Sequence, residues 1–259
     1  MLLPIGRKTS DIAIGDCRLI YCNCCNIMRS MTHEQLKAGR LETALTQVQA
    51  AARLGVSQPY LSQLEKGERP ITAELARSAA ALYRLPATAL PIPESVAQRV
   101  PANLDALARQ LAGLGYPGFA HLRHAKANPA AVLLEALVQE DLEVRLAEAL
   151  PWVVLTYPDM DWPWLIREVK LRDAQNRLGF VVAMARDLAA TRSRFRPALD
   201  RISSVAIELE RARLAREDTL CRGSMPPAER EWLATTRSAL ARHWNLVTGL
   251  TVDQLSHVT

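Results

Sequence analysis

Apolar side chains recur along most of the chain with the 3.6-residue period of an amphipathic helix. Helix-start signals fall at Asn128 and Asp161, each with a proline in the first turn that follows. Further helical runs are expected over 198–220 and 226–246, and Thr251 is expected to cap a last short turn. No β-hairpin signal and no repeat of fixed period interrupts this pattern. It therefore predicts an all-α fold.

Residues 32–91 have the pattern of short helices joined by tight turns. The first helix is expected to begin near Thr32 and to end near Ala44, and Thr46 has the position of an N-cap for the second. Other start and stop signals are the turn residue Gly55, the N-caps Ser57 and Thr72, and the terminating Gly67. The positions expected to face inward are Leu36, Arg40, Leu41, Ala51, Ala52, Leu54, Val56, Leu61, Leu64, Ile71, Leu75, Ala76, Ala79 and Leu82.

Proline positions divide the chain into segments. Four prolines fall within 85–101, and proline lacks a backbone donor and disfavours helix in the residue before it, so this stretch is expected to be a connector. The predicted organisation is an irregular extension (1–31), a small helical domain (32–91), a Pro-rich linker (92–101) and a larger helical domain (102–259).

Composition and charge indicate that any polyanion-binding site lies in the first third of the chain. The net charge of +5 is compatible with a partner such as DNA. Residues 92–259 carry 21 basic and 20 acidic side chains, so most of the mass is nearly neutral. No stretch approaches the apolar length of a membrane span, and the N-terminus lacks the apolar core of a signal peptide. We therefore expect a cytoplasmic protein with no membrane partner.

Four of the five cysteines crowd the N-terminal extension. Their spacing, C-x4-C-x-C-C, matches no common zinc site, and His33 is the only histidine near them. We therefore expect no metal site and no cofactor. An alternative interpretation of this cysteine-rich segment is that it precedes the true start of the protein, at Met28 or Met31. The four residues are Cys17, Cys22, Cys24 and Cys25.

The small domain resembles a known DNA-binding family. The stretch LTQVQAAARLGVSQPYLSQLEKGERPIT contains an L-T-Q opening, L-G-V-S at a turn and L-x-x-L-E-x-G at the close. In residue type and spacing it resembles the Cro/phage-repressor (Xre) helix-turn-helix family, over about 60 residues from Thr32 to Leu90. The resemblance implies a five-helix domain whose third helix enters the major groove of double-stranded DNA.

Roles for single residues follow from the resemblance and from base chemistry. A glutamine amide can pair with N6 and N7 of adenine, which makes Gln58 and Gln63 candidate base readers. The full set of candidate base-contacting residues is Gln58, Pro59, Tyr60, Ser62 and Gln63. Candidates for contact with the DNA backbone are Gln47, Lys66 and Arg69. The resemblance also implies a structural pair between Arg40 and Glu65.

The larger domain gives weaker signals. Residues 150–186 hold three tryptophans, Trp152, Trp162 and Trp164. They line a ligand pocket, form a partner-binding surface or, as we favour, pack in a helical core. The polar trio 175–177 lies either at a helix contact or, in the favoured interpretation, on an exposed face. Arg-rich segments over 192–201 and 208–216 suggest a second nucleic-acid contact. The favoured interpretation is a solvated helix laced with salt bridges, because Glu and Arg recur at i, i+3 and i, i+4 in the second segment.

The sequence thus favours a transcriptional regulator that binds operator DNA as a homodimer. The larger domain would dimerise and would sense a small-molecule effector or a protein partner. An alternative is an antitoxin-like protein that neutralises a partner enzyme and regulates its own gene through the helix-turn-helix. No catalytic constellation and no phosphate-binding loop appears, so an enzyme is not expected.

Overall fold

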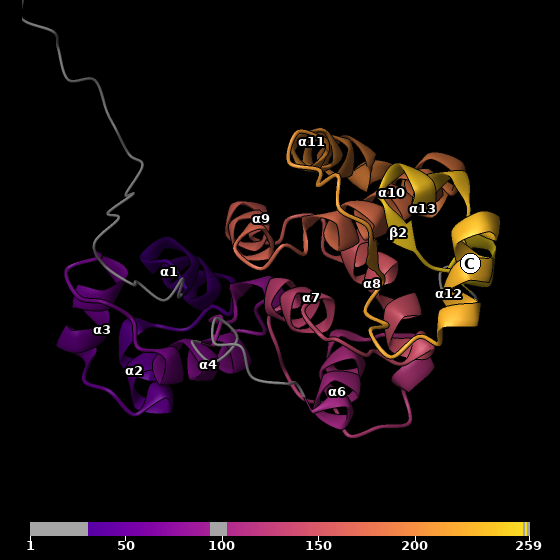
Figure 1. Ribbon diagram of the computed structural model, residues 1–259. Coiled ribbons are helices and arrows are strands. Elements are labelled where there is room, and N and C mark those ends of the chain that lie inside the picture. Colours follow the sequence, from indigo (N-terminus) through magenta and orange to yellow (C-terminus); the bar gives the residue numbers. More distant parts are fainter. Residues whose placement is uncertain (1–30, 94–102, 256, 258–259) are drawn as a thin grey trace, which may run out of the picture.

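The computed structural model describes residues 31–93, 103–255 and 257. This part of the chain is built from twelve α-helices, four short 3₁₀ helices and one pair of two-residue parallel strands, which confirms the all-α prediction. Figure 1 shows two helical lobes, with the smaller one formed by the N-terminal helices. The helices of the smaller lobe are α1 (His33–Glu42), α2 (Gln47–Leu54), α3 (Gln58–Glu65) and α4 (Ala73–Leu82).

The remaining elements belong to the larger lobe or to the segment that leads into it. They are η1 (Ala87–Ala89), α6 (Leu104–Leu114), η2 (Pro117–Phe119), α7 (Pro129–Leu137), α8 (Val144–Thr156), α9 (Trp162–Lys170), α10 (Gln175–Thr191), η3 (Ser193–Ala198), α11 (Leu199–Glu210), β1 (Asp218–Thr219), α12 (Pro227–Thr236), α13 (Ala239–His243), β2 (Leu246–Val247) and η4 (Val252–Gln254).

The smaller lobe follows its local signals closely. Thr32, Thr46, Ser57 and Thr72 each accept a hydrogen bond in the first turn of the helix that they precede, as predicted. Two inward assignments are wrong, because Leu41 is 58% exposed and Ala52 is exposed. Each lies about 100° around its helix from a buried neighbour, so the buried stripes are narrower than the apolar pattern suggests.

Two further differences from the prediction concern the start of this lobe and the number of its helices. Met31, the last residue of the predicted extension, is buried in the small core. Residues 31–93 contain four α-helices and the short η1 rather than five α-helices. The four N-terminal cysteines and most of the predicted linker lie outside the described residues.

The larger lobe is organised around α10, which packs against α8, α11 and η3. Eight of the nine residues of α7 are buried, and this helix packs against α6, α8 and α9. Trp152, Trp162 and Trp164 are all buried in this core, so the core interpretation of the tryptophans is confirmed. Asp161 caps α9 through the backbone N–H of Trp164.

In the polar trio at the start of α10, Gln175 and Asn176 are buried and Arg177 is partly buried, which corrects the favoured prediction of an exposed face. Asn176 is 2% exposed; its Oδ1 accepts from the Leu214 N–H at 2.8 Å and its Nδ2 donates to the Leu214 carbonyl at 2.9 Å. Arg177 donates to both carboxylate oxygens of Asp218 and to two main-chain carbonyls. Asn176 and Arg177 therefore anchor the chain that follows α11.

Two long helices predicted for the C-terminal third are shorter than expected. α11 ends at Glu210 rather than near 220, because the next segment is held by the buried Asn176 and enters β1. The run 226–246 breaks after Thr236, where Arg237 is extended (φ −52°, ψ 150°) and Ser238 caps a new helix. The Arg-rich segment 208–216 therefore lies only partly on a helix.

The start of the predicted connector is packed against both lobes. Leu85 and Leu90 contact the small core, whereas Ile92 is buried in the large one. Asn128, the N-cap of α7, donates from Nδ2 to the carbonyl of Leu90 at 2.7 Å and to that of Thr88 at 3.3 Å. The main chain around η1 is thus hydrogen-bonded to the larger lobe.

Candidate nucleic-acid interface

The α2–turn–α3 unit is set by its caps and by one left-handed turn residue. Thr46 and Gln49 form a reciprocal capping box at the start of α2. Gly55 ends α2 with φ +70°, a conformation that costs glycine little. Ser57 then accepts from the Tyr60 N–H and starts α3, with Pro59 in the first turn. Helix α3 lies at the edge of the small lobe (Figure 1), and Pro59 in its first turn is exposed.

Below this turn lies an ion pair that joins α1 to the end of α3. Arg40 donates from Nε and Nη2 to the two carboxylate oxygens of Glu65, at 2.6 and 2.9 Å. Arg40 Nη1 also donates to the Leu45 carbonyl at 3.0 Å. The side chains are 9% and 2% exposed, so both charges are nearly desolvated. Burial by itself raises the pKa of Glu65, but hydrogen bonds from Arg40 and Gln47 and the positive charge of Arg40 lower it overall.

A chain of hydrogen bonds runs from this ion pair to the surface of α3. Gln47 donates from Nε2 to Glu65 Oε2 at 2.9 Å. Gln58 in turn donates from Nε2 to Gln47 Oε1 at 2.8 Å. Because a glutamine amide has two donors and an acceptor oxygen, Gln58 retains one N–H and its carbonyl oxygen. These are the two groups that a bidentate pair with adenine requires.

A second cluster lies around the end of α3. Arg69 donates from Nε to Gln63 Oε1 at 2.8 Å, and its guanidinium lies 5.6 Å from the centroid of the Tyr60 ring. Tyr60 is half-buried and packs against the small core, so it is less outward than predicted. In this conformation the carbonyl oxygen of Gln63 is occupied, and its amide nitrogen is the group left for a base.

The other candidate residues differ in exposure. Pro59 and Lys66 are exposed, and Ser62 is half-buried. Lys66 is the C-cap of α3, and Gly67 follows with φ +74°. The structure therefore brings Gln47, Gln58, Arg40 and Glu65 into one hydrogen-bonded chain. Arg69 is hydrogen-bonded to Gln63 and lies over the ring of Tyr60.

The comparison with family models matches this unit. Residues 36–90 match the family model described as helix-turn-helix. These residues are a helix-turn-helix domain of the Xre type. The chain therefore carries the DNA-binding domain of regulators of this type. The match leaves the larger lobe without a family, and no match was found among curated proteins or among solved structures.

Sequence reasoning missed the link between Gln47 and Gln58 of the helix-turn-helix domain. It assigned Gln47 to a phosphate contact and treated Gln58 by itself. Each glutamine is the first residue of its helix, but the turn by itself brings only the end of α2 to the start of α3, so the sequence carries no direct signal for this contact. The continuation from Gln47 to Glu65 requires the packing of α2 on α3, and the link from Glu65 to Arg40 requires the packing of α1 on α3.

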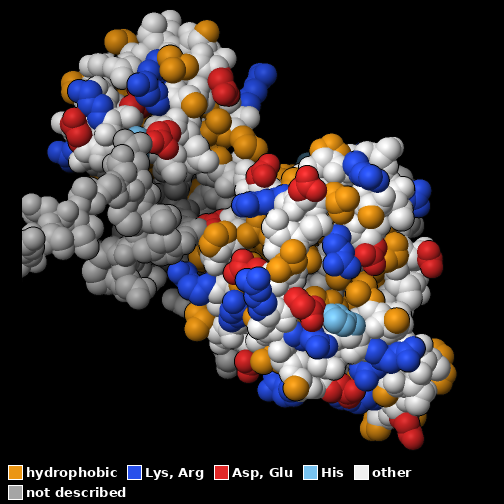
Figure 2. Space-filling view, turned by 90° about the horizontal axis from the view of Figure 1, so that it is seen from above, with side chains coloured by type: hydrophobic (Ala, Val, Ile, Leu, Met, Phe, Trp, Pro, Cys, Tyr) orange, Lys and Arg blue, Asp and Glu red, His pale blue; other side chains and the backbone are white. Residues whose placement is uncertain are grey.

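The surface of the larger lobe is of mixed charge. Figure 2 shows basic and acidic side chains interspersed over the visible face of this lobe rather than gathered by sign. The ion pair Arg213–Glu210 lies within one of the Arg-rich segments, and Arg216 of the same segment pairs with Asp173. Within the described residues, no group of three or more potential metal ligands gathers. None of the described helices is long and apolar enough to cross a bilayer.

Proposed function

We propose that this protein is a sequence-specific transcriptional regulator that reads operator DNA through α3 in the major groove. The observation that carries the proposal is the Gln58 amide, which is held by Gln47 at the exposed start of α3 with one donor and one acceptor free. Such an amide is oriented before DNA arrives, so less side-chain freedom is lost on binding. The family match to the helix-turn-helix supports this use of α3.

The remaining candidates divide by chemistry. We propose that Gln63 and Ser62 hydrogen-bond to base edges, and that Pro59 and Tyr60 make apolar contact with a thymine methyl group. Gln47, Lys66 and Arg69 would contact phosphates, which position the domain and supply salt-dependent affinity. In this scheme Arg69 leaves Gln63 when it meets a phosphate and so frees the Gln63 carbonyl.

We further propose that the protein acts as a homodimer, with residues 32–91 as the reading domain and 102–259 as the dimerisation and sensing domain. One recognition helix reads only a few base pairs, whereas two copies that read half-sites about 34–36 Å apart gain specificity. Sedimentation of the full chain at micromolar concentration tests this, since a dimer has twice the monomer mass of 28.7 kDa. A monomer in the presence of saturating operator would exclude the dimer.

The experiment that tests DNA reading is selection of duplexes from a random-sequence library by the full-length protein. We expect enrichment of one motif with two inverted half-sites whose centres are about 10 base pairs, or a multiple of one helical turn, apart. A single enriched half-site would retain α3 as the reader and reject the dimer. Enrichment of no motif, at any salt concentration that permits binding, would reject sequence-specific reading.

A further inference from the structure

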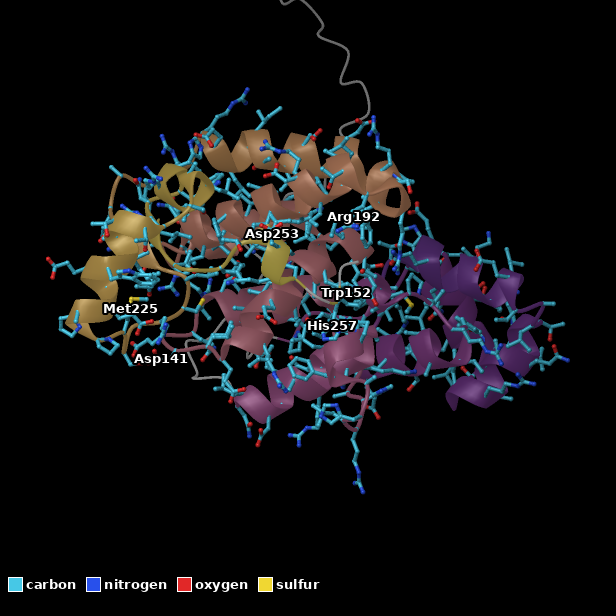
Figure 3. The ribbon with its side chains drawn as sticks, turned by 90° about the vertical axis from the view of Figure 1, so that its right-hand side faces the viewer. Asp141, Trp152, Arg192, Met225, Asp253 and His257 are labelled. Carbon is cyan, nitrogen blue, oxygen red and sulfur yellow. The ribbon has the colours of Figure 1, made fainter. Side chains whose placement is uncertain are left out.

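A cavity of about 570 Å³ lies between α8, α12 and the segment that follows β2. Its apolar walls include Leu142, Ala147, Trp232, Leu233 and Val247. Met225, another lining residue, lies at the end of the molecule opposite the helix-turn-helix domain (Figure 3). The volume falls in the range of roughly 300–1,000 Å³ that is usual for pockets that bind small organic molecules.

Helix α12, which forms one wall, is weakly held. Leu233 is the one buried residue among its ten. With Met225 and Val247 it forms a small apolar cluster separate from the main core. Trp232 is 62% exposed at the cavity, whereas the other four tryptophans are at most 7% exposed. An apolar molecule bound in the cavity would therefore cover aromatic surface of Trp232, which is exposed to water in the free chain.

The polar part of the wall has an excess of positive charge. Arg222 and Arg237 line the cavity together with one carboxylate, Glu229, which is paired with Arg222. Arg237 is 3.2 Å from Glu217 Oε2, but Glu217 is shared with Arg230 at 3.6 Å. Among the residues that line the cavity, two guanidinium groups thus meet one carboxylate, while Glu217 and Asp141, outside the lining, interact with Arg237 and Arg222.

Arg237 also has unused hydrogen-bonding capacity. Its Nη1 donates to the Leu246 carbonyl, whereas its buried Nε has no partner. A buried N–H without a partner is unfavourable, and an incoming acceptor that shifts the guanidinium would relieve this cost. The cavity therefore combines an apolar body with a cationic corner.

We propose that this cavity is a binding site for a small organic anion with an apolar body. The apolar body packs against Trp232 and Leu233, and the anionic group faces Arg222 and Arg237. The proposal does not rest on DNA binding, because every residue that it uses lies in the larger lobe. It assigns a site to the lobe that the helix-turn-helix match does not cover.

The test is a fluorescence titration of the full chain with 1-anilinonaphthalene-8-sulfonate, an aromatic anion, and with its uncharged counterpart N-phenyl-1-naphthylamine. We expect saturable one-to-one binding of the anion and weaker binding of the neutral probe. Trp232→Ala should weaken binding of the anion about tenfold, which corresponds to about 1.4 kcal/mol. Because Trp232 is exposed, this variant should keep the helical circular dichroism of the wild type.

Two further variants separate the site from general surface adsorption. Leu171→Ala removes a side chain that is 69% exposed just beyond α9, outside the cavity, and should leave binding unchanged. Arg222→Gln should weaken binding of the anion but not of the neutral probe. Equal affinities for the two probes, equal losses in Trp232→Ala and Leu171→Ala, or no saturable binding would each overturn the proposal.

Discussion

At the scale of single residues, the buried pair of Arg40 and Glu65 connects the stability of the small lobe with the position of Gln58. Glu65 accepts from Arg40 and from Gln47, and Gln47 accepts from Gln58. A side chain that is 2% exposed thereby helps to orient one on the surface. Loss of the Glu65 charge should affect folding first and the orientation of Gln58 second.

Glu65→Gln is expected to lower the free energy of unfolding by about 3 kcal/mol, because it leaves the buried guanidinium of Arg40 without its counter-charge. Urea unfolding at neutral pH, followed by circular dichroism, measures this change. The double variant Arg40→Met, Glu65→Leu serves as the control, since it removes both charges and should recover part of the loss. If the single variant is as stable as the wild type, the pair does not hold α1 on α3.

The stability that Glu65 supplies should depend on pH in one direction. Its pKa in the folded chain lies below the ordinary value of 4.5, since the hydrogen bonds and charge of its partners outweigh the effect of burial. A carboxyl with a lowered folded pKa contributes stability that is fully present above the unfolded pKa and is lost as the pH falls through the folded pKa. The difference between wild type and Glu65→Gln should therefore shrink below about pH 4.5.

Parallel urea titrations of the two proteins over a pH series measure this convergence. The comparison isolates Glu65, because the other carboxyls, such as Glu168, are common to both proteins. A difference that stays constant through the acid range would contradict the assignment of a lowered pKa to Glu65.

At the scale of elements, the sequence predicts a helix boundary well where the contacts that set it lie within a few residues. Thr46 and Ser57 are predictable N-caps, because the partner of each lies three residues ahead in the same helix. The end of α11 at Glu210 is not predictable in this way. It depends on Asn176, which binds the main chain of Leu214 across 38 residues of sequence.

The candidate site shows the same limit. Gln47, Gln58, Arg40 and Glu65 were all named from the sequence, because they occupy positions in a recognised motif. The sequence does not predict that these side chains form one hydrogen-bonded chain, since the hydrogen bond between Gln58 and Gln47 joins two helices. The cavity beside Trp232 was also missed, because its walls come from segments about 80 to 100 residues apart that carry no shared motif.

Gly179→Ala should destabilise the chain although alanine is the better helix former. A Cβ at this position of α10 would lie 2.2 to 2.5 Å from ring atoms of Trp244, which is 2% exposed. The clash should outweigh a propensity gain of about 1 kcal/mol, with a net loss of about 1–2 kcal/mol in unfolding free energy. Chemical denaturation measures the loss.

The double variant Gly179→Ala, Trp244→Leu tests the cause of that loss. If the ring is the obstacle, the two substitutions should cost less together than the sum of their separate effects. Additive costs would show that the close approach of Trp244 is not what requires glycine at position 179.

At the scale of the whole molecule, the two lobes share the segment around η1. Leu85 and Leu90 belong to the small core, Ile92 belongs to the large one, and Asn128 of the large lobe binds the carbonyls of Thr88 and Leu90. Binding in the larger lobe therefore has a physical route to the orientation of the helix-turn-helix domain.

Asn128→Asp is expected to loosen this junction while it preserves the cap of α7. The Oδ1 acceptor for the Ala130 N–H remains, but the donor to Thr88 and Leu90 is replaced by a carboxylate oxygen. Hydrogen exchange of the Ala89 and Leu90 amides should accelerate severalfold. Asn103→Asp is the matched control, because Asn103 caps α6 through acceptor contacts alone. Equal exchange rates of these two amides in both variants would contradict the role of Asn128 in holding the junction.

The central claim is that α3 reads DNA sequence through the Gln58 amide. The most direct test compares the affinity of wild type and Gln58→Ala for the selected duplex and for a scrambled one, at one fixed salt concentration. We expect the variant to lose about 1–3 kcal/mol on the selected duplex and almost nothing on the scrambled one, with the fold unchanged. Full preference for the selected duplex in a variant that carries both Gln58→Ala and Gln63→Ala would contradict the account.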